Sequence, residues 1–172
     1  NDFHDRPTHP GMPGASLAIP GSFQSAMHLI ALLECCGHAI DEILVTRDEH
    51  DAYDIGHPRY WKQTSNGLPV RPFTQLTSRD LLEGLYITAD PSATQHAIDY
   101  LMALEEGGYG PHMVWPEHCK KGTWGACVVP EIAQALEEWS TKHHKVVPHI
   151  YKGMNPRAES YSALGPSVTV GI

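Results

Sequence analysis

Apolar residues recur at helical spacing in three stretches of the chain. The first begins after Gly21 and ends near Gly37. In the second, Asp90 can cap a helix, Pro91 suits its first turn, and Gly107 can stop it. The third begins at a proline and ends at a pair of histidines. The pattern therefore predicts helices over residues 22–37, 90–107 and 130–144.

Three short apolar runs lie between or after these helices and are typical of buried strands. Pro, Gly and Asn turn signals fill residues 1–20 and 47–76, so both stretches are predicted to be irregular. Strands alternating with helices predict an α/β, three-layer sandwich with a mainly parallel, Rossmann-like sheet. No linker or repeat divides the chain, so we expect a single domain over residues 1–172. The predicted strands are "EILVT" (42–46), "HMVW" (112–115) and "KVVPHIY" (145–151).

Metal-type side chains follow these strands directly. Asp48 and His50 come after the first strand, His118 after the second and Lys152 after the third. Because the carboxyl ends of parallel strands meet at one edge of a sheet, we expect these side chains to converge there. One carboxylate and two imidazoles suit zinc, iron or manganese, with positions left open for water or substrate. His57 could add a fourth ligand, although a loop separates it from the others.

Each of these residues also has a purely structural interpretation. A lone Asp-x-His pair occurs often by chance, Asp48 could cap a turn, and His50 could be a solvated loop residue. His118 and Cys119 could be a packed core pair. A lysine held at an apolar strand end needs a partner, so a structural salt bridge explains Lys152 as well as catalysis does.

Charge and composition narrow the classes of partner. The 172 residues are 41% hydrophobic and 19% charged, and the net charge of −8 argues against nucleic acid or an anionic membrane as a partner. No apolar run approaches the roughly 20 residues of a membrane span. The four cysteines form no secreted disulfide framework, which predicts a reducing, cytoplasmic setting.

Five segments, in order, resemble the nicotinamidase/isochorismatase-like superfamily of cysteine hydrolases. "NDF" resembles the end of the family's Asp-x-Gln-Asn-Asp-Phe motif, and "GASLAIPG" its Gly-Ser-Leu-x-Val-Pro segment. "TRDEHDAYDIGHP" resembles its metal loop, and "YKGMNPRAESYSAL" its Lys-Gly segment. "WPEHCKKGTWGA" is close to Trp-Pro-x-His-Cys-x-x-Gly-Thr-x-Gly-Ala, the most specific motif of the set. The similarity runs through nearly the whole chain.

The resemblance implies roles for particular residues. Asp48, His50 and His118 would bind a divalent metal, zinc first, with iron or manganese as alternatives and with His57 as a less certain ligand. Lys152 would be the catalytic lysine. Phe3 and Trp115 would line a pocket for a small planar amide, such as nicotinamide. In such enzymes a cysteine thiolate attacks the amide carbonyl, ammonia leaves, and water hydrolyses the thioester. The family often forms dimers or larger assemblies, so a homo-oligomer is also implied.

The chain departs from the family pattern in its catalytic set. The family's catalytic Asp precedes the "NDF" motif, and its nucleophilic Cys lies on a turn well past the Lys-Gly segment. We therefore expect a partial chain, without the first strand and the last strands and helices of the fold. The alternative is a non-catalytic pseudoenzyme that serves as a structural or binding subunit. A third interpretation is a metal-water hydrolase without a cysteine, with Asp51, Asp54 or Glu117 as base.

Overall fold

The three predicted helices form close to their predicted bounds. A computed structural model describes residues 1–5 and 14–170 of the chain. The Asp90 carboxylate accepts the backbone N–H of Ser92, but it caps a 3-10 helix (Pro91–Ala93), and the second long helix starts after it without a side-chain cap. His144, with a left-handed φ of 52°, ends the last helix. A short fourth helix, α2 (Ser78–Leu82), lies in a stretch with no predicted element. A capping box between Thr77 and Asp80 stabilises its N-terminus. The long helices are α1 (Ser22–Cys36), α3 (Thr94–Glu106) and α4 (Pro130–His143).

In the described part of the chain, six strands form three two-stranded sheets, where a single mainly parallel sheet was predicted. β1 (Val45–Asp48) pairs in parallel with β6 (His149–Lys152), which places Asp48 opposite Lys152. The other two pairs are antiparallel. The mixed α/β class is confirmed, but the prediction that residues 112–115 join the same parallel sheet as residues 42–46 is wrong. Those other pairs are β2 (Trp61–Gln63) with β4 (Tyr86–Thr88), and β3 (Thr74–Leu76) with β5 (His112–Val114).

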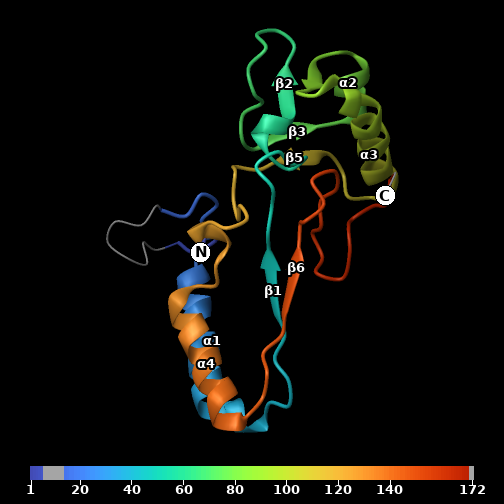
Figure 1. The fold of residues 1–172 in the computed structure, drawn as a ribbon. Coiled ribbons are helices and arrows are strands. Elements are labelled where there is room, and N and C mark those ends of the chain that lie inside the picture. The colour runs from blue at the N-terminus through green and yellow to red at the C-terminus, as the bar shows by residue number, and fades with distance from the viewer. Residues whose placement is uncertain (6–13, 171–172) are drawn as a thin grey trace.

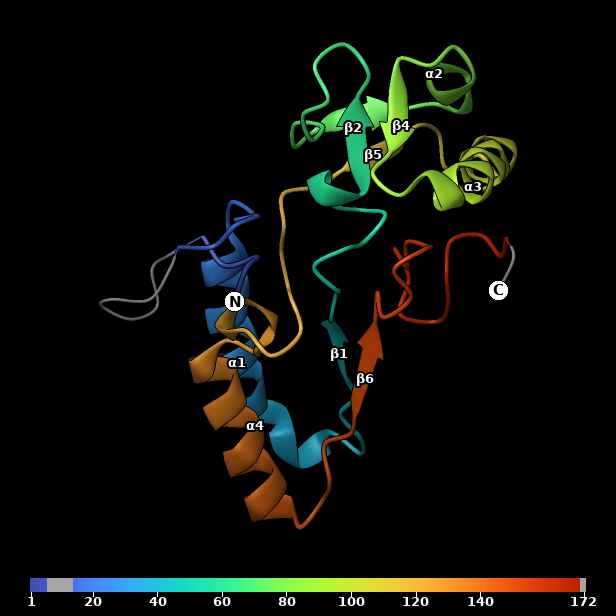
Figure 2. The same ribbon diagram turned by 45° about the horizontal axis from the view of Figure 1, so that its top comes forward.

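The core is divided into two clusters, and β1 and β6 run between them (Figure 1). One cluster joins α1 and α4 through Leu33, Leu136 and Trp139, with Val45 of β1 packed against it. The other lies among β2–β5, α2 and α3 at the opposite end of the molecule (Figure 2). The helix pair lies along one side of β1 and β6, so the predicted three layers do not form within residues 1–5 and 14–170. The carboxyl ends of β1 and β6 thus face the second cluster.

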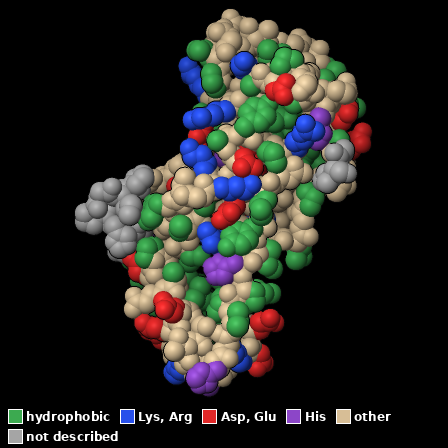
Figure 3. Space-filling view, in the orientation of Figure 1, with side chains coloured by type: hydrophobic (Ala, Val, Ile, Leu, Met, Phe, Trp, Pro, Cys, Tyr) green, Lys and Arg blue, Asp and Glu red, His purple; other side chains and the backbone are tan. Residues whose placement is uncertain are grey.

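The surface carries mixed charge. Acidic and basic side chains are interspersed on the face that Figure 3 shows. Lys120 pairs with Glu117 at 2.9 Å, and Lys121 pairs with Asp51 at 2.9 Å, so these lysines do not form an uncompensated basic patch. Of the helices in the described part of the chain, none has both the length and the apolar character to span a bilayer.

His112 makes folding stability sensitive to acid. Its side chain is 1% exposed, its Nε2 lies 2.8 Å from the Ile55 carbonyl oxygen, and burial lowers its pKa from 6.5 to about 4. Below pH 6.5 the unfolded chain takes up a proton that the folded chain refuses until about pH 4, so stability falls as the pH falls through that window. Each pH unit inside the window costs about 1.4 kcal/mol.

We therefore expect His112 to remove about 2 kcal/mol of unfolding free energy between about pH 7.5 and pH 5. Urea unfolding of the wild type and of His112→Gln, both with a chelator present, measures this contribution. Glutamine keeps a donor for the Ile55 carbonyl but does not titrate. On acidification, the variant should therefore lose less unfolding free energy than the wild type, by the contribution expected of His112. Equal losses in the two proteins would show that His112 does not resist protonation.

Candidate metal centre

The predicted convergence occurs, but by a different route along the chain. After β5, the chain leaves its own sheet and crosses the end of β1, where residues 117–121 lie beside His50. The backbone N–H of His50 donates to the Cys119 carbonyl at 2.9 Å, and the N–H of Lys121 donates to the His50 carbonyl at 2.9 Å. This short parallel bridge, and not the pairing of β5 with β1, brings His118 to the end of β1.

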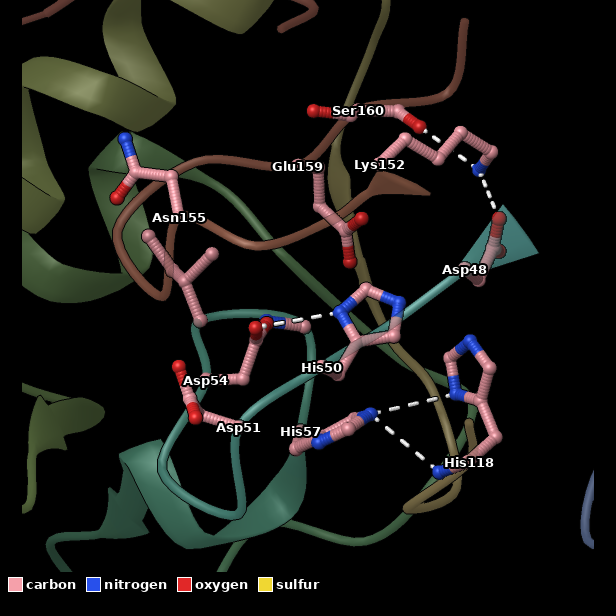
Figure 4. Close-up of polar contacts among 12 residues, drawn as sticks. Asp48, His50, Asp51, Asp54, His57, His118, Lys152, Asn155, Glu159 and Ser160 are labelled. Atoms are coloured by element: carbon pink, nitrogen blue, oxygen red, sulfur yellow. Dashed lines mark hydrogen bonds and ion pairs between the residues drawn. The ribbon is translucent and has the colours of Figure 1, made fainter. Parts of the chain in front are cut away.

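Three of the predicted ligands come together at this point. Asp48, His50 and His118 each offer one ligand atom, and these atoms lie within 4.8 Å of one another. Both histidines are buried, at 4% and 5% exposure, and Asp48 is half-buried. Figure 4 shows the two rings and the carboxylate turned toward a common space. The donor set fits a divalent metal that keeps an open coordination position, with zinc, iron and manganese all compatible.

The environment of His118 favours the neutral, metal-binding form of its ring. Its Nδ1 lies 2.8 Å from the Pro116 carbonyl oxygen, which can only accept a hydrogen bond. Nδ1 therefore carries the proton, and Nε2 is left with a free lone pair. Burial also lowers the pKa of His118, and a deprotonated imidazole is the form that binds metal.

His57 lies beside His118 and outside the three-ligand group. Its Nε2 is 3.3 Å from Nδ1 of His118 and also accepts the backbone N–H of His118 at 3.4 Å. The ring is fully buried, and burial lowers its pKa to about 4. In this position, Nε2 of His57 serves as a hydrogen-bond acceptor for the backbone of His118. The role of His57 as a fourth ligand stays a prediction.

Lys152 lies at the edge of the three-ligand group. Its Nζ is 2.6 Å from Oδ1 of Asp48 and donates to the Ser160 carbonyl at 2.9 Å. The ammonium group is thus partnered, as the structural interpretation of Lys152 requires. It also contacts Asp48, one of the three candidate ligands, and its catalytic role stays a prediction.

The two predicted aromatic walls lie in different surroundings. Phe3 packs edge-on against the His118 ring, with ring centroids 5.5 Å apart. Trp115 packs edge-on against Phe73, with ring centroids 6.3 Å apart. Phe3 therefore lies at the candidate metal centre, whereas the ring of Trp115 contacts that of Phe73. Substrate binding by either residue stays a prediction.

Two buried carboxyl groups lie behind the ligands. Oδ2 of Asp54 is 3.2 Å from Nδ1 of His50; burial lowers the pKa of His50, but this hydrogen bond and charge outweigh it and leave the pKa raised. Glu159 is 5% exposed, and burial, followed by the charge of Asp54, raises its pKa to about 7. From the sequence, Asp54 was a candidate only as a base, and Glu159 was not a candidate. "NPRAES" has the composition of a solvated loop, so no local signal marked Glu159 as buried.

Cys119 follows a ligand in sequence but is not prepared to act as a nucleophile. Its Sγ donates to the Gly125 carbonyl at 3.9 Å, and burial raises the pKa of its thiol to about 12. The thiol therefore stays protonated at neutral pH, and a thiolate is the reactive form. Cys35, Cys36 and Cys127 are exposed free thiols.

The fold is that of the nicotinamidases. The yeast nicotinamidase Pnc1p is 23% identical over 96% of this chain, with a TM-score of 0.57, and its complex with the inhibitor nicotinaldehyde gives 0.58. A nicotinamidase/pyrazinamidase from Acinetobacter baumannii is 20% identical over 91% of this chain, with a TM-score of 0.50. The chain spans 58% of the yeast structure and 52% of the bacterial one. No protein-family model and no curated protein sequence matches the chain.

Proposed function

We propose that the protein is a nicotinamidase-like amidohydrolase that cleaves a small amide beside a bound divalent metal. The reaction would be the conversion of nicotinamide to nicotinate and ammonia, or that of a related small amide. The observation that carries the proposal is the gathering of Asp48, His50 and His118 beside Lys152 at the end of β1. The nicotinamidase fold supports the choice of an amide as the substrate.

The residues of the site suggest a chemical role for each group in the reaction. A bound metal would polarise or orient a water molecule or a substrate atom. The Lys152 ammonium group, held by Asp48, lies where it can stabilise negative charge on a reacting carbonyl oxygen. Phe3 would flank a planar substrate at the His118 ring. A thioester route needs a cysteine other than Cys119, since that thiol is buried and protonated.

The two alternatives are a non-catalytic subunit and a metal-water hydrolase, and they require different residues. A non-catalytic binding or structural subunit needs only the fold and the metal ligands, and Asp48, His50 and His118 supply such a ligand group. For a metal-water hydrolase, two of the three candidate bases are already paired: Glu117 with Arg59 and Lys120, and Asp51 with Lys121. The third, Asp54, contacts His50.

Ammonia release from nicotinamide by the natural, zinc-loaded polypeptide tests the proposal. Its intact mass, compared with the 19.0 kDa of this sequence, shows whether the natural polypeptide is longer. Activity that a thiol alkylator abolishes supports the cysteine mechanism, and activity that survives alkylation supports a metal-bound water. Stoichiometric zinc without release from any small amide supports the binding subunit and overturns the proposed activity.

A further inference from the structure

The ring of His50 is fixed from two sides. On one side, Nδ1 lies 3.2 Å from Oδ2 of Asp54, and both side chains are buried, at 5% and 2% exposure. On the other side, the backbone of Gly153 lies so close that a Cβ there would be 2.6 Å from Cε1 of the ring. The ring therefore has little freedom to turn, and the identity of the atom facing Nδ1 decides which nitrogen carries the proton.

The Asp54 carboxylate is itself oriented. Its Oδ1 accepts the backbone N–H of Gly56 at 2.9 Å, which leaves Oδ2 to face His50. A Cβ on residue 56 would lie 3.3 Å from Oδ1 of Asp54 and 2.0 Å from Oε1 of Glu159, so the glycine permits this close approach. An ionised carboxylate only accepts hydrogen bonds. The contact therefore requires a proton on Nδ1 and leaves the lone pair of Nε2 free, on the side of the ring that faces Asp48 (Figure 4).

We propose that Asp54 is a positioning residue that fixes the tautomer of His50, so that Nε2 of His50 is the metal-binding atom. The inference rests on the proposed metal site and assigns Asp54 a task in it. The Pro116 carbonyl does the same for His118, so each imidazole has its own acceptor at Nδ1. A carboxylate that holds the outer nitrogen of a metal-binding histidine also raises the basicity of the ligand.

The variant Asp54→Asn distinguishes this role from simple packing. The Gly56 N–H still needs an acceptor, so the amide oxygen should take the place of Oδ1 and the amide NH₂ should face Nδ1 of His50. Nδ1 must then accept, which moves the proton to Nε2 and blocks the metal-binding atom. We expect the zinc dissociation constant to rise about 10- to 100-fold. Competition with a chromophoric chelator measures it.

Two carboxylate variants serve as matched controls. Asp51→Asn removes an exposed charge from the same loop, one that pairs with Lys121 and does not touch the ring. Glu159→Gln removes the other buried carboxyl near His50 and leaves the Nδ1 contact in place. Both should bind zinc within about three-fold of the wild type, well inside the loss expected for Asp54→Asn. If Glu159→Gln weakens binding as much as Asp54→Asn, general negative charge and not the tautomer is responsible, and the proposal fails.

A second measurement needs no variant. Nitrogen-15 NMR of the metal-free wild type, labelled at histidine, reports which ring nitrogen of His50 is protonated, and the proposal requires Nδ1–H. The spectra are read at a pH where the ring is neutral, and a neutral ring with its proton on Nε2 overturns the proposal even if Asp54→Asn does not fold. Wild-type protein that binds zinc no better than His118→Ala refutes the metal site itself. Tight wild-type binding that Asp54→Asn retains within about two-fold refutes only the role of Asp54.

Discussion

Replacing His118 with alanine is expected to abolish stoichiometric zinc binding. The change leaves Asp48 and His50 as a two-ligand remnant, and the loss should exceed the roughly 10- to 100-fold that removal of an outer-shell partner costs. Metal analysis after dialysis should find one zinc per chain in the wild type and none in the variant. The chelator competition assay gives the size of the loss.

An exposed histidine on a neighbouring strand provides the control for His118. His149 lies on β6, one strand from the site, and is exposed. His149→Ala should keep one zinc per chain, which shows that removing any imidazole is not sufficient. Full zinc retention by His118→Ala would refute the ligand assignment and, with it, the proposed metal-dependent hydrolase.

Gly153→Ala is expected to damage both stability and metal binding. Residue 153 has a φ of +72°, where a side chain costs about 1 kcal/mol or more, and the new Cβ would lie 2.6 Å from the buried His50 ring. Overpacking of this kind typically adds about 1–3 kcal/mol. We expect the unfolding free energy to fall by about 2–4 kcal/mol. Zinc affinity should fall as well, because the ring must move away from the other ligands.

Gly84→Ala separates the cost of the backbone conformation from the cost of the contact with His50. Its φ of +73° matches that of Gly153, but a Cβ there meets nothing within 4 Å. Gly84→Ala should therefore carry only the backbone cost and leave zinc binding unchanged. Urea unfolding and chelator competition on both variants test the comparison. Equal effects of the two substitutions would show that contact with His50 does not matter.

The sequence predicted those elements whose own residues decide their structure. The apolar spacing and Pro130 at a first turn give α1, α3 and α4 nearly their observed bounds, although Asp90 caps a short 3-10 helix (Pro91–Ala93) and α3 itself begins only at Thr94. The short elements between residues 47 and 88 were missed. β2, β3 and β4 have three residues each, too few for a periodic signal, and they are held by pairing with distant partners. β5 was predicted correctly as a strand but placed in the wrong sheet, because its partner β3 was not recognised.

In the candidate site, too, features set by local sequence were predicted, whereas contacts between segments far apart in the chain were not. Asp48, His50 and His118 stand out as metal-type residues next to strands, and their convergence was predicted. The bridge between His50 and residues 119–121 could not be read from the sequence, because it joins backbone groups about 70 positions apart. Glu159 was missed for a related reason. Its burial depends on how the segment after β6 packs, including the hydrogen bond from its N–H to the Tyr100 hydroxyl.

The wide separation of the ligands along the chain makes metal affinity a measure of folding. No short peptide of this sequence contains the full donor set, so an unfolded chain would hold an ion only weakly. A metal that binds the native state alone adds about 2.7 kcal/mol to its stability at a hundred times the dissociation constant. The midpoint of thermal denaturation should then rise with zinc concentration, and this dependence would persist in a chain that has no activity at all.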